Sequence, residues 1–225
     1  MKYLESRIIR QIDAAAVAEL GMTGLLLMEN AARGACEVLE TAMPQGRIII
    51  LSGPGNNGGD GLAMARLLAA NGIDSEVHLV RAGKSLTEDA QSNLEFLRRG
   101  GIKVEEADEK NLQSVLAVLT TDDWIVDALL GTGIRGTLRT PFVEIVNAIN
   151  QSSARVLSVD VPSGLDADTG EPCGVAVRAE VTVTFVATKA GFRFPHAVPY
   201  LGRVVVRQIG IPQRWLSAWC ETHTA

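Results

Sequence analysis

The sequence predicts an α/β fold, with a mostly parallel central sheet and helices on both faces. Short β-rich runs alternate along the chain with segments of helical pattern, an order typical of right-handed βαβ connections. Several β-rich runs, such as 48–51, are apolar with little alternation. Strands of that kind are buried on both faces, as in a parallel sheet.

The elements are expected in the following order. Residues 1–43 form a helical pair, at about 9–20 and 25–42, interrupted by a Gly-containing break at 21–24. Strands are predicted over 47–51, 75–80, 102–105, 124–127, 156–160, 181–187 and 204–208. Helices are predicted over 59–71, 87–100, 109–119 and 141–150. No helical pattern separates the last two strands, which predicts an antiparallel pair at one edge of the sheet.

Composition excludes several classes of protein. Residues 1–225 contain no repeat, low-complexity tract or linker, so a single domain is expected. A net charge of −5 and 4% aromatic residues argue against nucleic acid as a partner. Three scattered cysteines indicate a reducing compartment without a disulfide framework. The chain shows no signal-peptide pattern and no apolar run of membrane-spanning length, so a cytoplasmic protein is expected.

The most informative segment is the glycine block at 53–61, Gly-Pro-Gly-Asn-Asn-Gly-Gly-Asp-Gly, directly after the first apolar strand. Glycines let the backbone turn sharply and approach a ligand closely. A helix follows, and its free N–H groups and positive dipole end meet this loop. The segment therefore predicts a site for an anionic or strongly polar ligand.

Two standard nucleotide motifs fit this block poorly. The first six residues satisfy G-x-G-x-x-G, but a dinucleotide fingerprint needs an acid at the end of the next strand, which ends in Val80 and Arg81. A P-loop would need Lys followed by Ser or Thr after Gly58, where the chain has Gly59 and Asp60. The missing acid at the end of the next strand also disfavours an ordinary nicotinamide dehydrogenase.

Polar groups also follow two other predicted strands. Asp127 closes one strand, Asp160 closes another, and Ser163 lies shortly beyond. The carboxyl ends of parallel strands share one edge, so these groups are expected beside the glycine block. Each carboxylate alone is equally well explained as a helix cap or turn residue. Together with Asn57 they offer oxygen donors, which suit a hard cation and not zinc.

A second glycine-rich segment at 130–137 follows Asp127 and is long for a simple strand-to-helix connection. Arg135 within it could contact a phosphate, as could Arg81, Lys84 and Lys189. For Lys189, which closes a strand, a solvated side chain is the favoured interpretation.

The chain resembles the NAD(P)H-hydrate epimerase family, also called the YjeF N-terminal domain. The resemblance is carried by residues 27–32 (Leu-Met-Glu-Asn-Ala-Ala), 53–61, 126–133 and 160–164 (Asp-Val-Pro-Ser-Gly), in the family's order. It implies a Rossmann-like three-layer sandwich, typically a homodimer. The implied activity, an isomerase reaction, interconverts the R and S forms of NADH or NADPH hydrated at C6 of the nicotinamide ring. A partner dehydratase, fused in some relatives and not expected in this chain, uses one epimer.

The resemblance also assigns residues. One potassium ion per subunit would be held by Asn57, Asp127 and Ser163. The hydrated dinucleotide would contact Asn56, Asn57, Gly58, Gly59, Asp60, Gly131, Thr132, Gly133, Ile134, Arg135, Gly136, Thr137 and Asp160.

Epimerisation breaks and remakes a C–O bond, so a proton must be supplied and removed. We expect Asp160 to be this acid–base, because burial at a strand end would raise its pKa. Asp60 is second choice, since a helix N-terminus favours its ionised form. The rival function is a non-catalytic nucleotide- or protein-binding scaffold of the same fold. A dimer contact is expected through helix 25–42, on the face of Ala31, Gly34 and Ala35.

Overall fold

The structure, a computed structural model, describes residues 3–223. Its main sheet has seven strands, all parallel, in the spatial order β4-β3-β2-β5-β6-β7-β9. These strands are β2 (Ile48–Ser52), β3 (Glu76–Leu79), β4 (Val104–Glu106), β5 (Trp124–Ala128), β6 (Arg155–Val159), β7 (Val181–Phe185) and β9 (Arg203–Arg207). The predicted α/β class with a mostly parallel sheet is confirmed.

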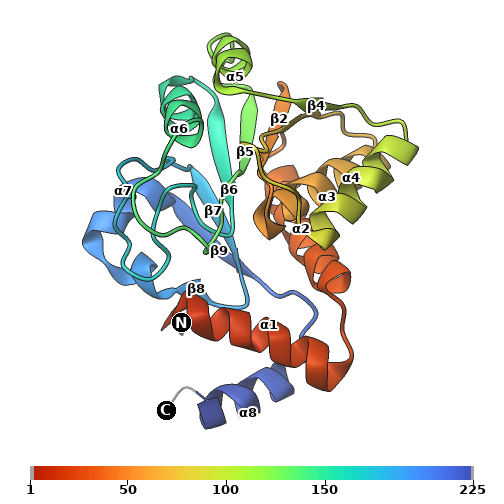
Figure 1. Ribbon diagram of the computed structural model, residues 1–225, viewed down its shortest axis with the longest axis vertical. Helices are drawn as coiled ribbons and strands as arrows, with labels where there is room; N and C mark the ends of the chain where they lie inside the picture. The colour runs from red at the N-terminus through yellow and green to blue at the C-terminus, as the bar shows by residue number, and fades with distance from the viewer. Residues whose placement is uncertain (1–2, 224–225) are drawn as a thin grey trace.

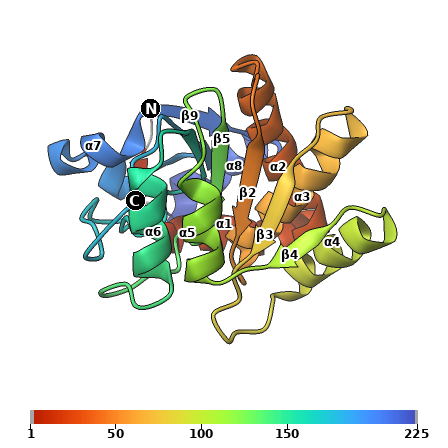
Figure 2. The same ribbon diagram turned by 90° about the horizontal axis from the view of Figure 1, so that it is seen from above.

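Helices cover both faces of the sheet, as Figures 1 and 2 show. They are α1 (Ser6–Leu20), α2 (Gly24–Thr41), α3 (Asn56–Ala70), α4 (Glu88–Arg99), α5 (Glu109–Leu116), α6 (Phe142–Gln151), α7 (Val198–Leu201) and α8 (Gln213–His223). Alternate residues of β2 point to different cores. Ile50 packs with α2, α3 and α4 on one side, and Ile49 and Leu51 pack with α5 and α6 on the other. A strand buried on both faces explains the continuous apolar run.

The strand order reverses direction between β2 and β5. From β2 the chain moves outward to β3 and β4, and it then returns to β5 on the other side of β2. The carboxyl ends of β2 and β5 therefore lie side by side while their following segments diverge. Open parallel sheets bind ligands at such a switch point. The glycine block leaves β2 at this place (Figure 1).

The expected antiparallel pair at the sheet edge is wrong, because β7 and β9 pair parallel, with Val183 opposite Val205. The crossover between them is built from β8 (Thr188–Lys189), the 3₁₀ turns η1 (Ala190–Arg193) and η2 (Pro195–Ala197), and α7. These pieces are too short to show a helical period in the sequence. Strand β8 itself pairs parallel with β1 (Tyr3–Leu4) in a separate two-stranded sheet.

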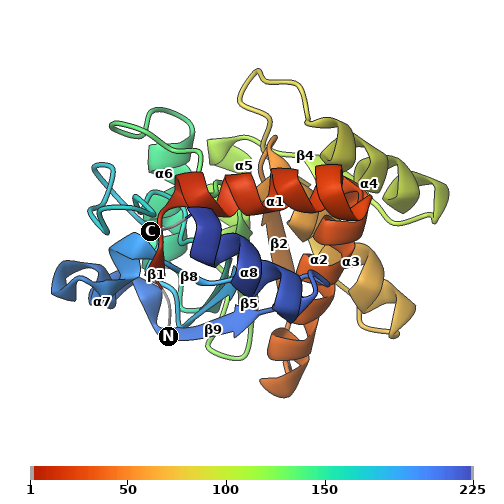
Figure 3. The same ribbon diagram turned by 90° about the horizontal axis from the view of Figure 1, so that it is seen from below.

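The N-terminal helix α1 is tied down at both ends. At its start, the backbone N–H and Oγ of Ser6 donate to the carboxylate of Asp168 at 2.6 and 2.7 Å. Near its other end, Trp215 of α8 donates its indole N–H to Glu19 at 3.2 Å. Helices α1 and α8 lie side by side in Figure 3, and the helix α8 was not predicted from the sequence. These contacts fix where α1 crosses the molecule.

The predicted dimer face of α2 is already used within the chain. Ala31, Gly34 and Ala35 are buried, and a Cβ at Gly34 would meet the Arg207 side chain of β9. The argument for dimerisation from this face is therefore wrong, because its small residues allow α2 to approach the sheet. Within residues 3–223, no helix combines the length and apolar character needed to span a membrane.

Candidate functional site

The glycine block joins the ends of two neighbouring strands. The backbone N–H of Gly53 donates to the carbonyl of Ala128 at 3.0 Å. A Cβ at Gly53 would collide with the carbonyl of Leu129, and one at Gly58 would collide with the carbonyl of Gly53. Glycine is therefore required at both positions for the chain to pass between β2 and β5.

Helix α3 begins at Asn56 and not at the expected 59, because Gly55 is extended and the Asn-Asn-Gly-Gly-Asp segment forms the first helical residues. Gly58 and Gly59 are buried in this turn, and a Cβ at Gly59 would strike the side chain of Met28. Neither glycine lines the cavity described below. Their small size instead lets the helix N-terminus sit close to its neighbours.

Asp127, at the end of β5, is fully buried and holds the adjacent turn in place. One carboxylate oxygen accepts from Ser158 Oγ and from the backbone N–H of Ser163, both at 2.8 Å. The other accepts from Ser163 Oγ at 2.6 Å. Burial raises the pKa of Asp127, and the hydrogen bonds from Ser163 and Ser158 oppose that rise.

Asn57 extends this network toward α3. Its Nδ2 donates to the carbonyl of Leu130 at 3.0 Å, and the N–H of Leu130 donates to Ser163 Oγ at 2.9 Å. Its Oδ1 is buried and has no hydrogen-bond partner in the described part of the chain. The three residues predicted to hold a cation are thus brought together, with Leu130 between them and one amide oxygen unused.

Asp160 directly follows β6 and has a strained backbone, with φ of 65°. Its N–H donates to the carbonyl of Val183 at 2.7 Å, which holds that conformation. Its Oδ1 lies 2.6 Å from Nζ of Lys189, whose side chain is 0% exposed. The solvated interpretation of Lys189 is therefore wrong, since its ammonium group is buried against Asp160.

Two more carboxyl groups lie near this ion pair. Burial, followed by the charges of Asp160 and Asp13, raises the pKa of Asp60 well above its usual range. The sequence favoured an ionised Asp60 at the helix N-terminus, and burial acts on its pKa in the opposite direction. Asp13 of α1 was not predicted as a site residue. Burial is again the main influence, and it raises the pKa of Asp13 to about 6, with Lys189 opposing and Asp160 adding to the rise.

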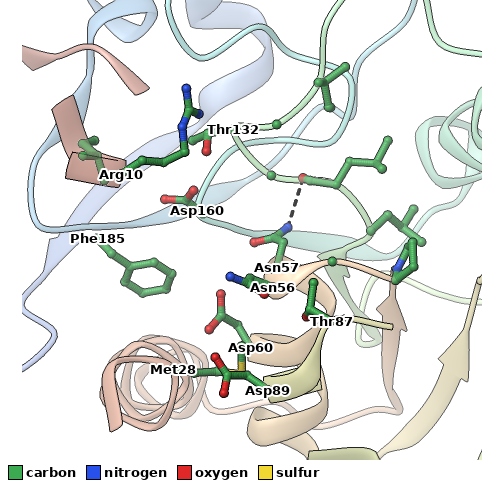
Figure 4. Close-up of a pocket in the computed structure, with 18 of the residues that line it drawn as sticks. Arg10, Met28, Asn56, Asn57, Asp60, Thr87, Asp89, Thr132, Asp160 and Phe185 are labelled. Atoms are coloured by element: carbon green, nitrogen blue, oxygen red, sulfur yellow. Dashed lines mark hydrogen bonds between the residues drawn. The ribbon is translucent and has the colours of Figure 1, made fainter. Parts of the chain in front are cut away.

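A cavity of about 1210 Å³ opens over these groups. It is large enough for a dinucleotide-sized ligand. Figure 4 shows the carboxyl groups of Asp60 and Asp160, with the ring of Phe185 and the amide of Asn56, arranged around one space. The predicted residues that line the cavity are Asn56, Asn57, Asp60, Gly131, Thr132, Gly133, Ile134, Arg135, Gly136, Thr137 and Asp160. Asp127 and Ser163 lie behind its wall.

The predicted phosphate partners divide into two groups. Lys84 lines the cavity, whereas Arg81 pairs with Glu106 at 2.8 Å and does not line it. Arg135 lines the cavity, but its guanidinium group pairs with Asp168 at 3.2 Å. Arg10 of α1, which carries no motif in the sequence, also lines the cavity and lies near Thr132 in Figure 4.

Comparison with known proteins identifies the family of this chain. Residues 24–191 match the family model described as "YjeF-related protein N-terminus". The chain belongs to this family. The match covers the glycine block, Asp127, Asp160 and Lys189, and so confirms the resemblance read from the sequence.

Curated relatives support the assignment over most of the chain. The NAD(P)H-hydrate epimerase of Pirellula staleyi is 42% identical over 208 residues, which is 92% of this chain and 92% of the relative. The bifunctional NAD(P)H-hydrate repair enzyme Nnr of Archaeoglobus fulgidus is 39% identical over 95% of this chain and 42% of its own length. The crystal structure of yeast ynu0 matches with a TM-score of 0.74 and 27% identity, covering 85% of this chain and 83% of that one.

Proposed function

We propose that this chain is an isomerase that interconverts the R and S forms of hydrated NADH and NADPH. The observation that carries this proposal is the cavity at the β2 and β5 switch point, where Asn56, Asn57 and Asp60 of the glycine block and Asp160 line one dinucleotide-sized space. Relatives of about 40% identity that match nearly the full chain carry the name NAD(P)H-hydrate epimerase.

The hydrated dinucleotide lies in this cavity, against the N-terminus of α3 and the segment 131–137. The free N–H groups at the start of α3 favour the pyrophosphate. Arg10 and Lys84 supply positive charge at the cavity wall, and Lys84 is the predicted phosphate partner that stays free of an ion pair among the described residues. The hydrated ring lies deeper, beside Phe185, Asp60 and Asp160.

Asp160 is the acid–base at C6 in this proposal. Its carboxyl group is partly exposed to the cavity and is oriented by Lys189 and by Thr184, whose hydroxyl donates at 3.3 Å. The carboxyl group thus lies beside the ammonium group of Lys189 and is positioned to exchange a proton with water or with the C6 hydroxyl. The strained backbone at Asp160 aims the carboxyl group into the cavity.

A potassium ion fits the residues around Asp127. The buried Oδ1 of Asn57 is without a partner, and no cationic side chain among the described residues pairs with the buried Asp127. A cation held by Asn57, Asp127 and Ser163 would give the Oδ1 atom of Asn57 a partner. It would also offset the negative charge of the Asp127 carboxylate. Among residues 3–223, no group of three His, Cys, Asp or Glu side chains is placed to hold a metal ion. The donors proposed here are amide, hydroxyl and carboxylate oxygens, which suit a hard cation. Potassium is weakly polarising, and its role is to fix the turns that carry Leu130 and Ser163.

Two partners complete the proposal. An NAD(P)H-hydrate dehydratase is the proposed functional partner that removes one epimer, and the relatives named bifunctional NAD(P)H-hydrate repair enzymes carry two activities in one chain by their name. A homodimer is also proposed, and light scattering at micromolar concentration tests it, since a monomer would contradict it.

One assay decides the function. A single epimer of the hydrate, isolated by chromatography, is incubated with the purified protein, and the appearance of the other epimer is followed. Acceleration to the R/S equilibrium supports the proposal. A rate equal to the spontaneous one, with the dinucleotide still bound, would instead favour a binding scaffold.

A further inference from the structure

Four ionisable side chains meet at the floor of the cavity. They come from separate elements: Asp13 from α1, Asp60 from α3, Asp160 from the end of β6 and Lys189 from β8. Lys189 forms an ion pair with Asp160, with 2.6 Å between Nζ and Oδ1. One ammonium group thus stands against three carboxyl groups that influence one another electrostatically. Neighbouring carboxylates disfavour one another's ionisation, so the charges of this cluster favour a protonated carboxyl group beside the ion pair.

Asp13 is the member of this cluster with an unmet polar atom. Its side chain lines the cavity, and its Oδ1 is buried without a hydrogen-bond partner among residues 3–223. A buried carboxyl oxygen without a partner is costly. Because the residue also lines the cavity, a ligand that enters the cavity lies beside this carboxyl group.

We propose, resting on the proposed function, that Asp13 is a second proton-transfer residue, which works with Asp160 on the hydroxyl group at C6 of the hydrated ring. Inverting C6 requires the hydroxyl to leave one face and to return on the other. One carboxyl group must donate a proton at departure, and one carboxylate must accept a proton at return. Asp13 and Asp160 supply these two functions, and they exchange them when the reaction runs backward.

The bonds and electrons balance without an added reactant. The C6–O bond breaks as the N1 electron pair forms a C6–N1 double bond, and the proton of Asp13 converts the leaving hydroxyl into water. Water then adds to the opposite face of C6, the N1 electron pair returns, and Asp160 takes the released proton. The substrate keeps its composition and changes its configuration, while one proton has moved from Asp13 to Asp160.

The other neighbours do not fill this role. Burial raises the pKa of Asp60 well above its usual range, which disfavours the carboxylate form that would accept a proton. Asp89 of α4 acts on Asp60 and not on Asp13. Asp13 has a pKa of about 6, close enough to neutrality to bind and release a proton during turnover.

This pair of proton-transfer residues predicts how kcat/KM depends on pH. In both directions the active form carries one proton shared between Asp13 and Asp160, so the R-to-S and S-to-R reactions have the same profile. The groups that face Asp13 are Lys189, Asp160 and Asp60. We expect kcat/KM to fall as the pH rises above about 6, where Asp13 loses its proton.

The test compares Asp13→Asn with Glu19→Gln, the same change of acid to amide on an exposed residue of the same helix that does not line the cavity. Conversion of a single isolated epimer is measured from pH 5 to 9. For Asp13→Asn, we expect kcat to fall at least about 100-fold, the KM to stay within about threefold, and the alkaline decline to disappear. Glu19→Gln keeps the wild-type rate and profile.

Other outcomes overturn the inference. A wild-type rate or an unchanged alkaline decline in Asp13→Asn would remove Asp13 from proton transfer, and so would a raised KM with unchanged kcat. The wild-type profile is a test that needs no variant, because a kcat/KM that does not decline above about pH 6 would contradict a proton held by Asp13. Failure of the proposed function is distinct, since the wild-type protein would then not interconvert the epimers at all.

Discussion

Lys189 and Asp160 form a buried ion pair, with 2.6 Å between Nζ and Oδ1, although the two residues lie in different strand connections. The ammonium group also donates to the carbonyl of Phe185 at 3.3 Å. The pair orients the proposed acid–base and supplies the positive charge of a cluster otherwise made of carboxyl groups. Because Lys189 lies in β8, within the crossover between β7 and β9, the position of this crossover determines where the ammonium group lies in the site.

Replacing Lys189 with Met should therefore affect both stability and activity. Removing one partner leaves the Asp160 carboxylate partly buried without its countercharge, which costs roughly 3 kcal/mol in the free energy of unfolding. Urea denaturation measures this loss. The double variant Lys189→Met, Asp160→Asn has no unpaired charge, so it should be more stable than Lys189→Met alone. A double variant that is less stable by the sum of both changes would show that the pair is not coupled.

Gly58 gives a second prediction, because a Cβ there would enter the carbonyl of Gly53. Gly58→Ala should lower the free energy of unfolding by about 2 kcal/mol or more, since a backbone atom must shift. Gly55→Ala is the matched control: no heavy atom lies within 4 Å of its added Cβ, and its φ of −91° suits alanine. Equal stability of the two variants in urea denaturation would contradict the close approach of the first turn of α3 to the backbone of Gly53.

The sequence predicted the site wherever a residue ends a strand or belongs to the glycine block. Asp127 and Asp160 could be placed at one edge because apolar runs precede both, and parallel strands align their carboxyl ends. Ionisation could not be predicted in this way. Asp60 occupies a helix N-terminus, which favours charge, and only the packing of α2, α4 and the loops around it shows that it is desolvated.

Asp13 and Lys189 could not be assigned from local patterns. A single Asp in an amphipathic helix has the pattern of a solvated residue, and its position at the cavity depends on the distant contact between Ser6 and Asp168. The backbone leaves the direction of β7 at Val186, which has a φ of 67°. The chain then turns inward through β8, which carries Lys189. Such tertiary contacts leave no periodicity in the sequence.

Potassium provides a third prediction. Since binding to the folded state alone stabilises a protein, the melting temperature should rise with added KCl and not with tetramethylammonium chloride. Asp127→Asn should abolish this difference, because the charged ligand is lost. Ser158→Ala is the control, as its hydroxyl donates to Asp127 at 2.8 Å but is not a proposed ligand, so its potassium response should remain. Equal melting temperatures in both salts for the wild-type protein would remove the cation from the site.

The raised pKa of Asp13 makes a fourth prediction, about stability. The folded chain binds the Asp13 proton more tightly than the unfolded chain, because the pKa moves from 3.8 to about 6 on folding. The stabilising contribution of the protonated form is complete below about pH 4, and it is lost as the pH rises to about 6. The loss is at most about 3 kcal/mol, since one pKa unit corresponds to about 1.4 kcal/mol.

Asp13→Asn is neutral at every pH and escapes this loss. Its free energy of unfolding in urea should exceed that of the wild-type protein at pH 7, whereas the two should nearly agree at pH 4. Other titrating groups are common to both proteins and largely cancel in the difference. Glu19→Gln should show no such gain. An Asp13→Asn protein less stable than wild type at pH 7 would mean that the ionised carboxyl has a partner that stabilises it, and Asp13 would then not be poised to exchange a proton.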